Sequence, residues 1–215
     1  DLHSFPTRRS SDLHIDLRED RRHIQDHDVE RLSSTVQTVL NLELATSREI
    51  VDLACRLRPF QATIVPERRE EITTEGGLDL RQGGPRLAET IQQLAGAGIR
   101  VSLFIDPDYA VIDLAAALGV PAIELHTGDY AQHWREGNRA LESLRKATQH
   151  ARRAGLAVHA GHGLTYRNVV PVAAIAEIEE LNIGHSIVSR AVLNGMATAV
   201  REMRELVHSA RAAGA

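Results

Sequence analysis

The sequence is poor in aromatic residues, which make up 3% of its 215 residues. Its hydrophobic content of 43% must therefore come mainly from aliphatic side chains and alanine. Such residues suit the core of an α/β barrel, which branched side chains fill in layers. The chain also has a single cysteine, Cys55, which excludes an internal disulfide framework. Cys55 lies at helical spacing among apolar residues, so we expect a reduced core thiol in a cytoplasmic protein.

The sequence also lacks a net positive charge and a long apolar run, and each absence excludes a class of partner. The formal net charge of −4 provides no general basic field, so we expect no nucleic-acid partner. No apolar run approaches the roughly 20 residues that span a bilayer, and we expect no membrane association and no secretory leader. Arginine is locally dense in the segments 18–23 and 66–71, where acidic residues accompany it. This distribution favours a small anion such as phosphate as the partner of the positive charge.

The chain does contain seven short β-type runs, most of them followed by a helix-like stretch. The runs are apolar along their length and end in a polar or ionisable residue, which is typical of parallel strands buried on both faces. We therefore predict an α/β fold, a TIM-type (β/α)8 barrel whose strand ends carry the active site. The seven runs are HIDLR (14–18), VLNLE (39–43), ATIVPE (62–67), VSLFID (101–106), AIELH (122–126), AVHAGH (157–162) and LNIGH (181–185).

The first thirteen residues, DLHSFPTRRSSDL, differ from the rest because they lack periodicity. All of them can be translated from the sense strand of a common sequencing adapter. We interpret 1–13 as a non-native tail and 14–215 as one barrel domain that lacks its first β/α unit. On this interpretation the two strands beside the missing one are exposed, and the isolated chain is expected to be poorly soluble or inactive.

The ends of the runs supply the candidate site residues. Arg18 and the basic residues up to His23 follow the first run, where they either grip an anion or form a solvated charged loop. Glu43 ends an apolar run, which suits either a general base or a structural ion pair. Glu124 and His126 alternate onto one face of their strand, where they can exchange protons or form a satisfied core pair.

Glycine and histidine close the last two runs together, in HAGHGLTY (159–166) and NIGH (182–185). Glycine lets backbone amides approach a ligand closely. The loops after the last two strands of such a barrel commonly bind phosphate. The repeated Gly-His pair therefore predicts a shared anion pocket with an imidazole donor.

The stretch 131–154 is predicted as a single long helix.

Several of these motifs resemble those of the pyridoxine 5′-phosphate synthase family of the deoxyxylulose-dependent vitamin B6 route. The resemblance implies a TIM barrel with extra helices, assembled as a homo-octamer in the full-length parent, without cofactor or metal. It also implies condensation of 1-deoxy-D-xylulose 5-phosphate with 3-amino-2-oxopropyl phosphate, giving pyridoxine 5′-phosphate, phosphate and water. The motifs are LREDRRHI (17–24), NLE (41–43), VPERREEITTEGGLD (65–79), VSLFID (101–106), IELHTG (123–128), AGHGLTY (160–166) and LNIGH (181–185).

Carried over position by position, the resemblance implies roles for single residues. Glu43 would be the general base, His162 the general acid, and Glu124 would stabilise charge in the transition state. Asp16 stands where the family has a catalytic histidine, and we expect it to be a weak substitute. The substrate-binding positions are implied to be Arg18, His23 and Thr73 for the deoxyxylulose phosphate, and Gly163, Gly184 and His185 for the aminoketone and product phosphates.

Three alternatives from other classes remain open at the level of sequence. A metal-dependent aldolase or isomerase on the same barrel would use Glu124, His126, His162 and His185 as ligands. A non-catalytic barrel would bind a sugar phosphate without turning it over. An inactive truncated fragment would at most bind phosphate.

Overall fold

A computed structural model describes residues 12–66 and 76–214. Residues 1–11 of the predicted tail and Thr73 therefore lie outside the described residues. Leu13, the last residue of that tail, begins the first strand and pairs with Leu40.

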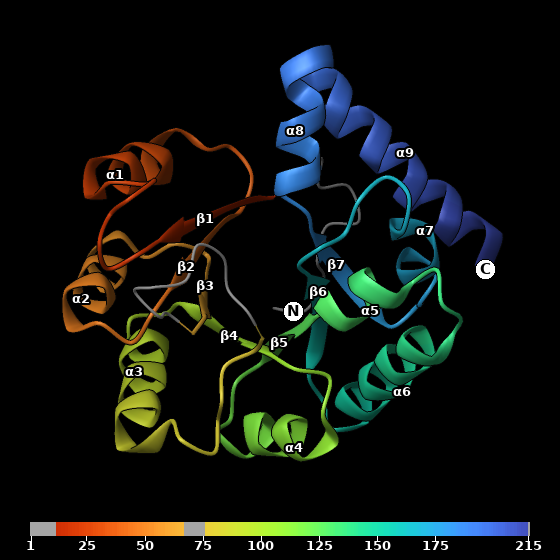
Figure 1. Cartoon of the computed structure of the whole chain (residues 1–215). Coiled ribbons are helices and arrows are strands. Elements are labelled where there is room, and N and C mark those ends of the chain that lie inside the picture. Colours follow the sequence, from red (N-terminus) through yellow and green to blue (C-terminus); the bar gives the residue numbers. More distant parts are fainter. Residues whose placement is uncertain (1–11, 67–75, 215) are drawn as a thin grey trace.

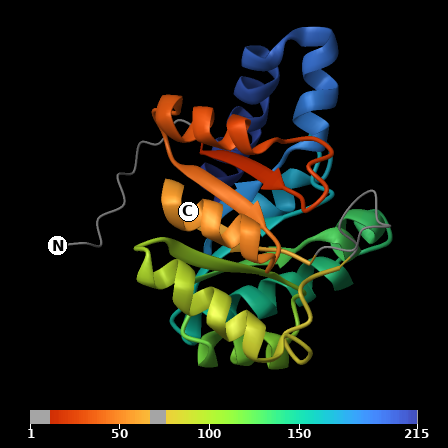
Figure 2. The same ribbon diagram turned by 90° about the vertical axis from the view of Figure 1, so that its left-hand side faces the viewer.

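Seven parallel strands form one sheet in the order of the chain. The sheet curls into an open barrel, as Figure 1 shows, and the predicted TIM-type α/β fold is confirmed. Figure 2 shows the arrows of the first strands pointing to the same side of the molecule. The strands are β1 (Leu13–Leu17), β2 (Leu40–Leu44), β3 (Gln61–Ile64), β4 (Arg100–Ile105), β5 (Ala122–His126), β6 (Ala157–Gly161) and β7 (Ile178–Asn182).

Helices surround the outer face of the sheet, and α8 and α9 stand together as a hairpin beyond β7 (Figures 1 and 2). Local signals explain several helix starts: the Asp108 carboxylate accepts hydrogen bonds from the amides of Ala110 and Val111, and proline opens α3. The helices are α1 (Asp26–Thr35), α2 (Arg48–Leu57), α3 (Gly84–Gly96), α4 (Tyr109–Ala117), α5 (Gly128–His133), α6 (Arg139–Arg153), α7 (Val169–Ala173), α8 (His185–Asn194) and α9 (Met196–Gly214).

The aliphatic core lies between the sheet and its helices rather than inside the barrel. Leu42, Leu44 and Leu103 are fully buried, and they alternate along their strands with residues of the opposite face. That opposite face is polar. The predicted core of aliphatic residues and alanine is confirmed. The following polar and ionisable residues lie on the opposite face: Asn41, Glu43, Thr63, Ser102, Glu124, His159 and Glu180.

Two predicted elements differ from the structure. The single helix over 131–154 is wrong, because the chain breaks between α5 and α6, where Gly137 has a φ of +129° that glycine tolerates. The last strand begins three residues before the predicted run, at Ile178. Glu179 and Glu180 interrupt the apolar pattern by which a buried strand is predicted from the sequence. Glu179 pairs with Arg152, while Glu180 is turned toward the inside of the curl.

The sequence predicts a reduced thiol at Cys55 and no membrane-spanning segment. Cys55 is free and half-buried against the core. Among the described helices, none has the length and apolar character that a bilayer span requires.

Candidate active site

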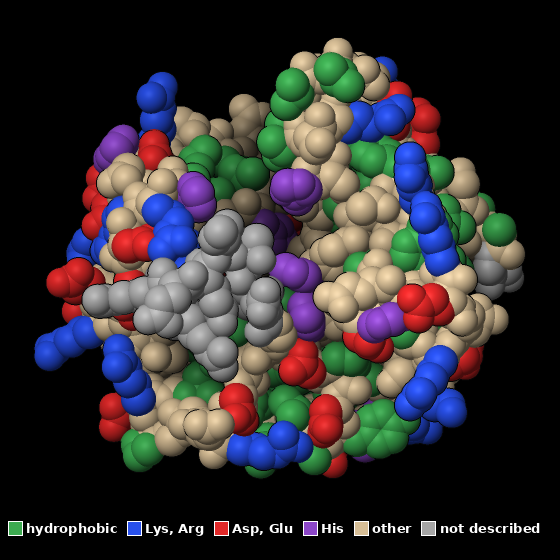
Figure 3. Space-filling view, in the orientation of Figure 1, with side chains coloured by type: hydrophobic (Ala, Val, Ile, Leu, Met, Phe, Trp, Pro, Cys, Tyr) green, Lys and Arg blue, Asp and Glu red, His purple; other side chains and the backbone are tan. Residues whose placement is uncertain are grey.

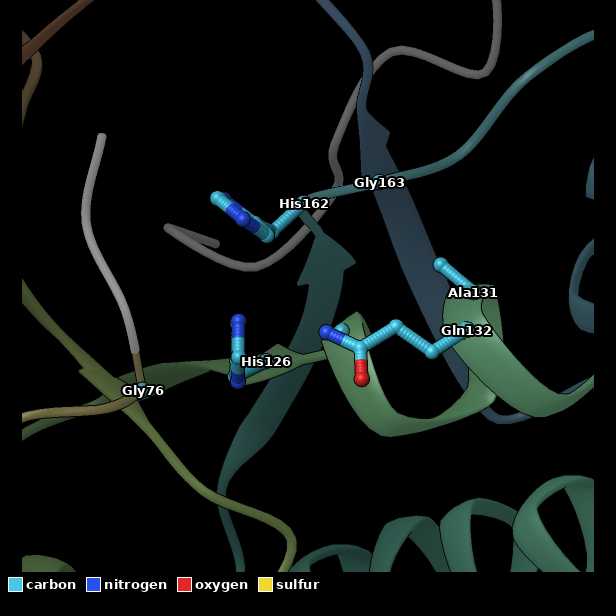
Figure 4. Close-up of a pocket in the computed structure, with 7 residues that line it drawn as sticks. Gly76, His126, Ala131, Gln132, His162 and Gly163 are labelled. Atoms are coloured by element: carbon cyan, nitrogen blue, oxygen red, sulfur yellow. The ribbon is translucent and has the colours of Figure 1, made fainter. Parts of the chain in front are cut away.

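A cavity of about 510 Å³ opens at the carboxyl ends of β5 and β6. Imidazole side chains gather around the hollow at the centre of this face of the molecule (Figure 3). Figure 4 shows His126 and His162 projecting into the same space, with Gln132 of α5 beside them. The carboxyl ends of parallel strands are where such barrels bind their substrates.

The His126 ring is held by Asp106, which ends the run VSLFID but is not among the predicted site residues. Its Nδ1 lies 3.2 Å from Asp106 Oδ1, which also accepts a hydrogen bond of 2.9 Å from the Gly77 amide. The bond to His126 is the largest influence on Asp106, and with the Gly77 bond it outweighs burial and lowers the pKa of that carboxyl. The ring of Phe104 meets His126 edge-on at 5.3 Å.

His162 follows β6 and lies with its ring centroid 4.8 Å from that of His126. Burial, reinforced by the charge of His126, lowers the pKa of His162, and the charge of Glu43 opposes the shift. The imidazole is therefore neutral at neutral pH and must accept a proton before it can donate one. Thr127 anchors the backbone here, because its hydroxyl lies 2.8 Å from the Gly161 carbonyl and 2.5 Å from that of His162.

Glu124 lies deeper, on β5, and is buried. Its Oε2 accepts a hydrogen bond of 2.6 Å from Asn182 Nδ2 on β7. Burial, together with the charge of Glu43, raises the pKa of Glu124 to about 8. Gly161 makes room for this carboxylate, since an added Cβ would lie 2.3 Å from Glu124 Oε1.

Glu43 reaches the same interior from β2. Its Oε1 lies 3.6 Å from His14 Nδ1. In the described part of the chain, the group of donors close enough to hold a metal ion is His14, Glu43 and Glu124, whose ligand atoms lie within 4.8 Å of one another. The ligand set predicted for a metal-dependent aldolase, with His126, His162 and His185, is not this group.

The remaining predicted residues lie at different places around the mouth. Asp16 is the register partner of Glu43, and Arg18 is buried directly after β1, whereas His23 is exposed before α1. Gly163 follows His162 and has a φ of +77°. Gly184 is the N-cap of α8 and His185 its first residue, and both are exposed.

The loop after β6 is joined to the start of α8, which follows β7, by a hydrogen bond. The Ser186 hydroxyl on α8 donates a hydrogen bond of 2.9 Å to the Leu164 carbonyl. His162 and Gly163 of the first Gly-His motif line the cavity, whereas Gly184 and His185 of the second are not among its lining residues.

Sequence reasoning missed His14 and Glu180. His14 Nε2 lies 3.0 Å from Glu180 Oε1, and the pair connects β1 with β7. The available signal was alternation, because His14 precedes Asp16 by two positions and so shares its face of the strand.

Comparison with known proteins shows the family of the chain. The family model described as Pyridoxal phosphate biosynthesis protein PdxJ matches residues 8–209. The chain belongs to this family. Among PdxJ relatives, a pyridoxine 5′-phosphate synthase from Gloeothece citriformis (strain PCC 7424) is 56% identical over 192 residues, covering 88% of this chain and 80% of the relative. The synthase of Blochmanniella pennsylvanica (strain BPEN) is 49% identical over 199 residues, covering 92% and 82%.

Solved structures with lower identity support the fold of this PdxJ chain. A chain of the Amycolatopsis orientalis BexX/CysO complex has a TM-score of 0.63 at 13% identity and covers 94% of this chain and 80% of its own length. The 3-hexulose-6-phosphate synthase from Salmonella typhimurium has a TM-score of 0.60 at 13% identity, covering 86% and 82%.

Proposed function

We propose that this PdxJ chain is a pyridoxine 5′-phosphate synthase. It would condense 1-deoxy-D-xylulose 5-phosphate with 3-amino-2-oxopropyl phosphate, releasing phosphate and water. The observation that carries the proposal is the convergence of Glu43, Glu124 and His162 at one end of the barrel, beside the joined loops after β6 and β7. The relatives named as synthases match most of the chain, which supports the same activity.

The chemistry needs a base, an acid and two anion sites. An amine and a ketone form an imine with loss of water, and proton transfers at carbon then prepare the ring closure. Glu43 would remove protons as the base. His162, neutral at rest, would take up a proton and return it to a departing oxygen. Glu124, with its raised pKa, would act as a neutral hydrogen-bond donor or stabilise positive charge as an anion.

Phosphate recognition is proposed for two sets of residues. The amides around Gly163 and Gly184, together with His185, would hold the phosphates of the aminoketone and the product. Arg18 and His23 would contact deoxyxylulose phosphate, and Thr73, which lies outside the described residues, is assigned to it by resemblance. Asp16 would be a weak base beside Glu43.

The test is direct assay of the purified chain with both substrates. On this proposal the chain is active, and pyridoxine 5′-phosphate and phosphate form in equal amounts. That result would overturn the expectation from the sequence that the isolated chain is poorly soluble or inactive. Activity that survives exhaustive chelation excludes the metal-dependent aldolase. A folded chain that makes no product contradicts the proposal and favours the inactive fragment or the phosphate-binding barrel, which isothermal titration with a sugar phosphate then separates.

We further propose that the protein acts in the cytoplasm as a homo-octamer. The free Cys55 fits a reducing compartment. Exposed apolar residues on α8 and at the start of α9 offer a surface for assembly, since Val188, Val192, Leu193 and Met196 are 53% to 87% exposed.

A further inference from the structure

His14 lies among carboxylates that come from different strands. Its Nε2 is 3.0 Å from Glu180 Oε1 on β7, and its Nδ1 is 3.6 Å from Glu43 Oε1 on β2. β1 and β7 are the two ends of the described sheet, and each has one strand as its neighbour there. The side chain of His14 therefore connects the two ends of the curl through the interior.

The surroundings of His14 are rich in negative charge. Asp16 and Glu43 are register partners on neighbouring strands, so their carboxylates share one face, an arrangement that is unfavourable without a positive charge nearby. Burial lowers the pKa of His14, but the nearby carboxylates of Glu180 and Glu43 and the charge of Glu124 raise the pKa to about 10. The ring is therefore an imidazolium at neutral pH.

Asn41 completes the contacts of the ring. Its side-chain amide lies 2.9 Å from His14 Nδ1 and also meets the Thr63 hydroxyl. The two ends of an amide are exchanged by a simple flip, so Asn41 can present its oxygen to an imidazolium and its NH₂ group to Thr63.

We propose that His14 is a positioning residue of the synthase, whose imidazolium bridges Glu43 and Glu180 and so fixes the general-base carboxylate in the barrel mouth. This inference rests on the proposed function. It differs from the expectation for Asp16, since His14 acts through Glu43 and lies two residues, roughly 6.6 Å, further from the mouth on β1.

The first experiment replaces the charge and keeps a polar side chain. We expect His14→Gln to lower kcat by about 10²-fold, because Glu43 loses its fixed orientation, while KM for both substrates stays within about 2-fold. His27→Gln on α1 is the matched control, since the His27 side chain is 76% exposed. It should leave both parameters unchanged.

The pH profile separates positioning from a merely structural role. The charge of His14 lowers the pKa of Glu124, against burial and the charge of Glu43, so His14→Gln should move the Glu124 limb of the kcat profile to higher pH. The charged and titratable groups around His14 and Glu180 in this interior are Asp16, Glu43, Arg100, Glu124 and His159. Unchanged kcat, or a lower kcat without a shift of the profile, overturns the proposal.

A second measurement uses the unmodified protein, so it remains possible if the His14→Gln variant fails to fold. It does not require enzymatic activity. In the unmodified protein, ¹⁵N imidazole shifts should show His14, assigned through its contacts with β2, doubly protonated at pH 8. A neutral ring at that pH overturns the proposal. If the unmodified chain makes no pyridoxine 5′-phosphate, the proposed function fails, and this measurement still decides whether His14 carries the bridging charge.

Discussion

Glu124 illustrates how burial alters one residue of the interior. Its folded pKa of about 8 lies above the ordinary 4.5, so the folded state holds a proton that the unfolded state releases between these values. Stability from this group is complete below pH 4.5 and is lost as the pH rises through 8. Deprotonation within the barrel is therefore costly to the fold.

Glu124→Gln should remove this dependence. The free energy of unfolding of the variant relative to the unmodified protein is expected to increase from pH 4.5 to pH 8 and to level off beyond that range. Urea denaturation across this range measures the difference. A difference that stays constant with pH would show that Glu124 is ionised throughout.

Glu43 should govern turnover rather than folding. We expect Glu43→Gln to lower kcat by about 10²-fold or more, because an amide cannot accept the substrate proton. Glu30→Gln at an exposed position of α1 provides the control, and steady-state assays with both substrates supply the measurement. A variant that keeps its turnover would assign the base to another residue.

The hydrogen bonds of the Thr127 hydroxyl join the ends of β5 and β6. Thr127→Val leaves the carbonyls of Gly161 and His162 without the hydroxyl, and we expect a loss of about 1–3 kcal/mol in unfolding free energy. Thermal or chemical denaturation measures it. Thr127→Ser retains the hydroxyl and should recover most of the loss; an equally unstable serine variant would trace the effect to packing.

Strand positions were predictable because parallel strands read as apolar runs, and the carboxyl ends of those runs led to Glu43, Glu124 and His162. The contacts between these residues were not predictable. Asp106, which follows β4, acts on His126 at the end of β5. Glu180 is predicted to precede its strand, because acidic residues are uncommon in strands. Such pairings depend on the curl of the sheet, which brings residues distant in the sequence together.

Assembly concerns the whole molecule. Leu193 on α8 is 87% exposed, and Figure 3 shows apolar side chains over this helix. Leu193→Asp should reduce the particle mass seen by light scattering, since a buried charge at an interface is unfavourable. The unfolding free energy of the dissociated chain should change by no more than about 0.5 kcal/mol. Arg31→Asp, at an exposed position of α1, is the control for an added acidic side chain elsewhere on the surface. It should leave the particle mass unchanged.

The backbone of His162 has a further consequence for the molecule as a whole. Its φ of +82° falls in the region where a Cβ is crowded, and glycine would occupy it without strain. Both His162→Gly and His162→Ala lose the imidazole, but the glycine variant should have the higher unfolding temperature. Its free energy of unfolding should exceed that of the alanine variant by about 1 kcal/mol. Glycine is therefore the residue that stability alone favours at this position, and the imidazole of His162 is kept there at a cost to the free energy of unfolding.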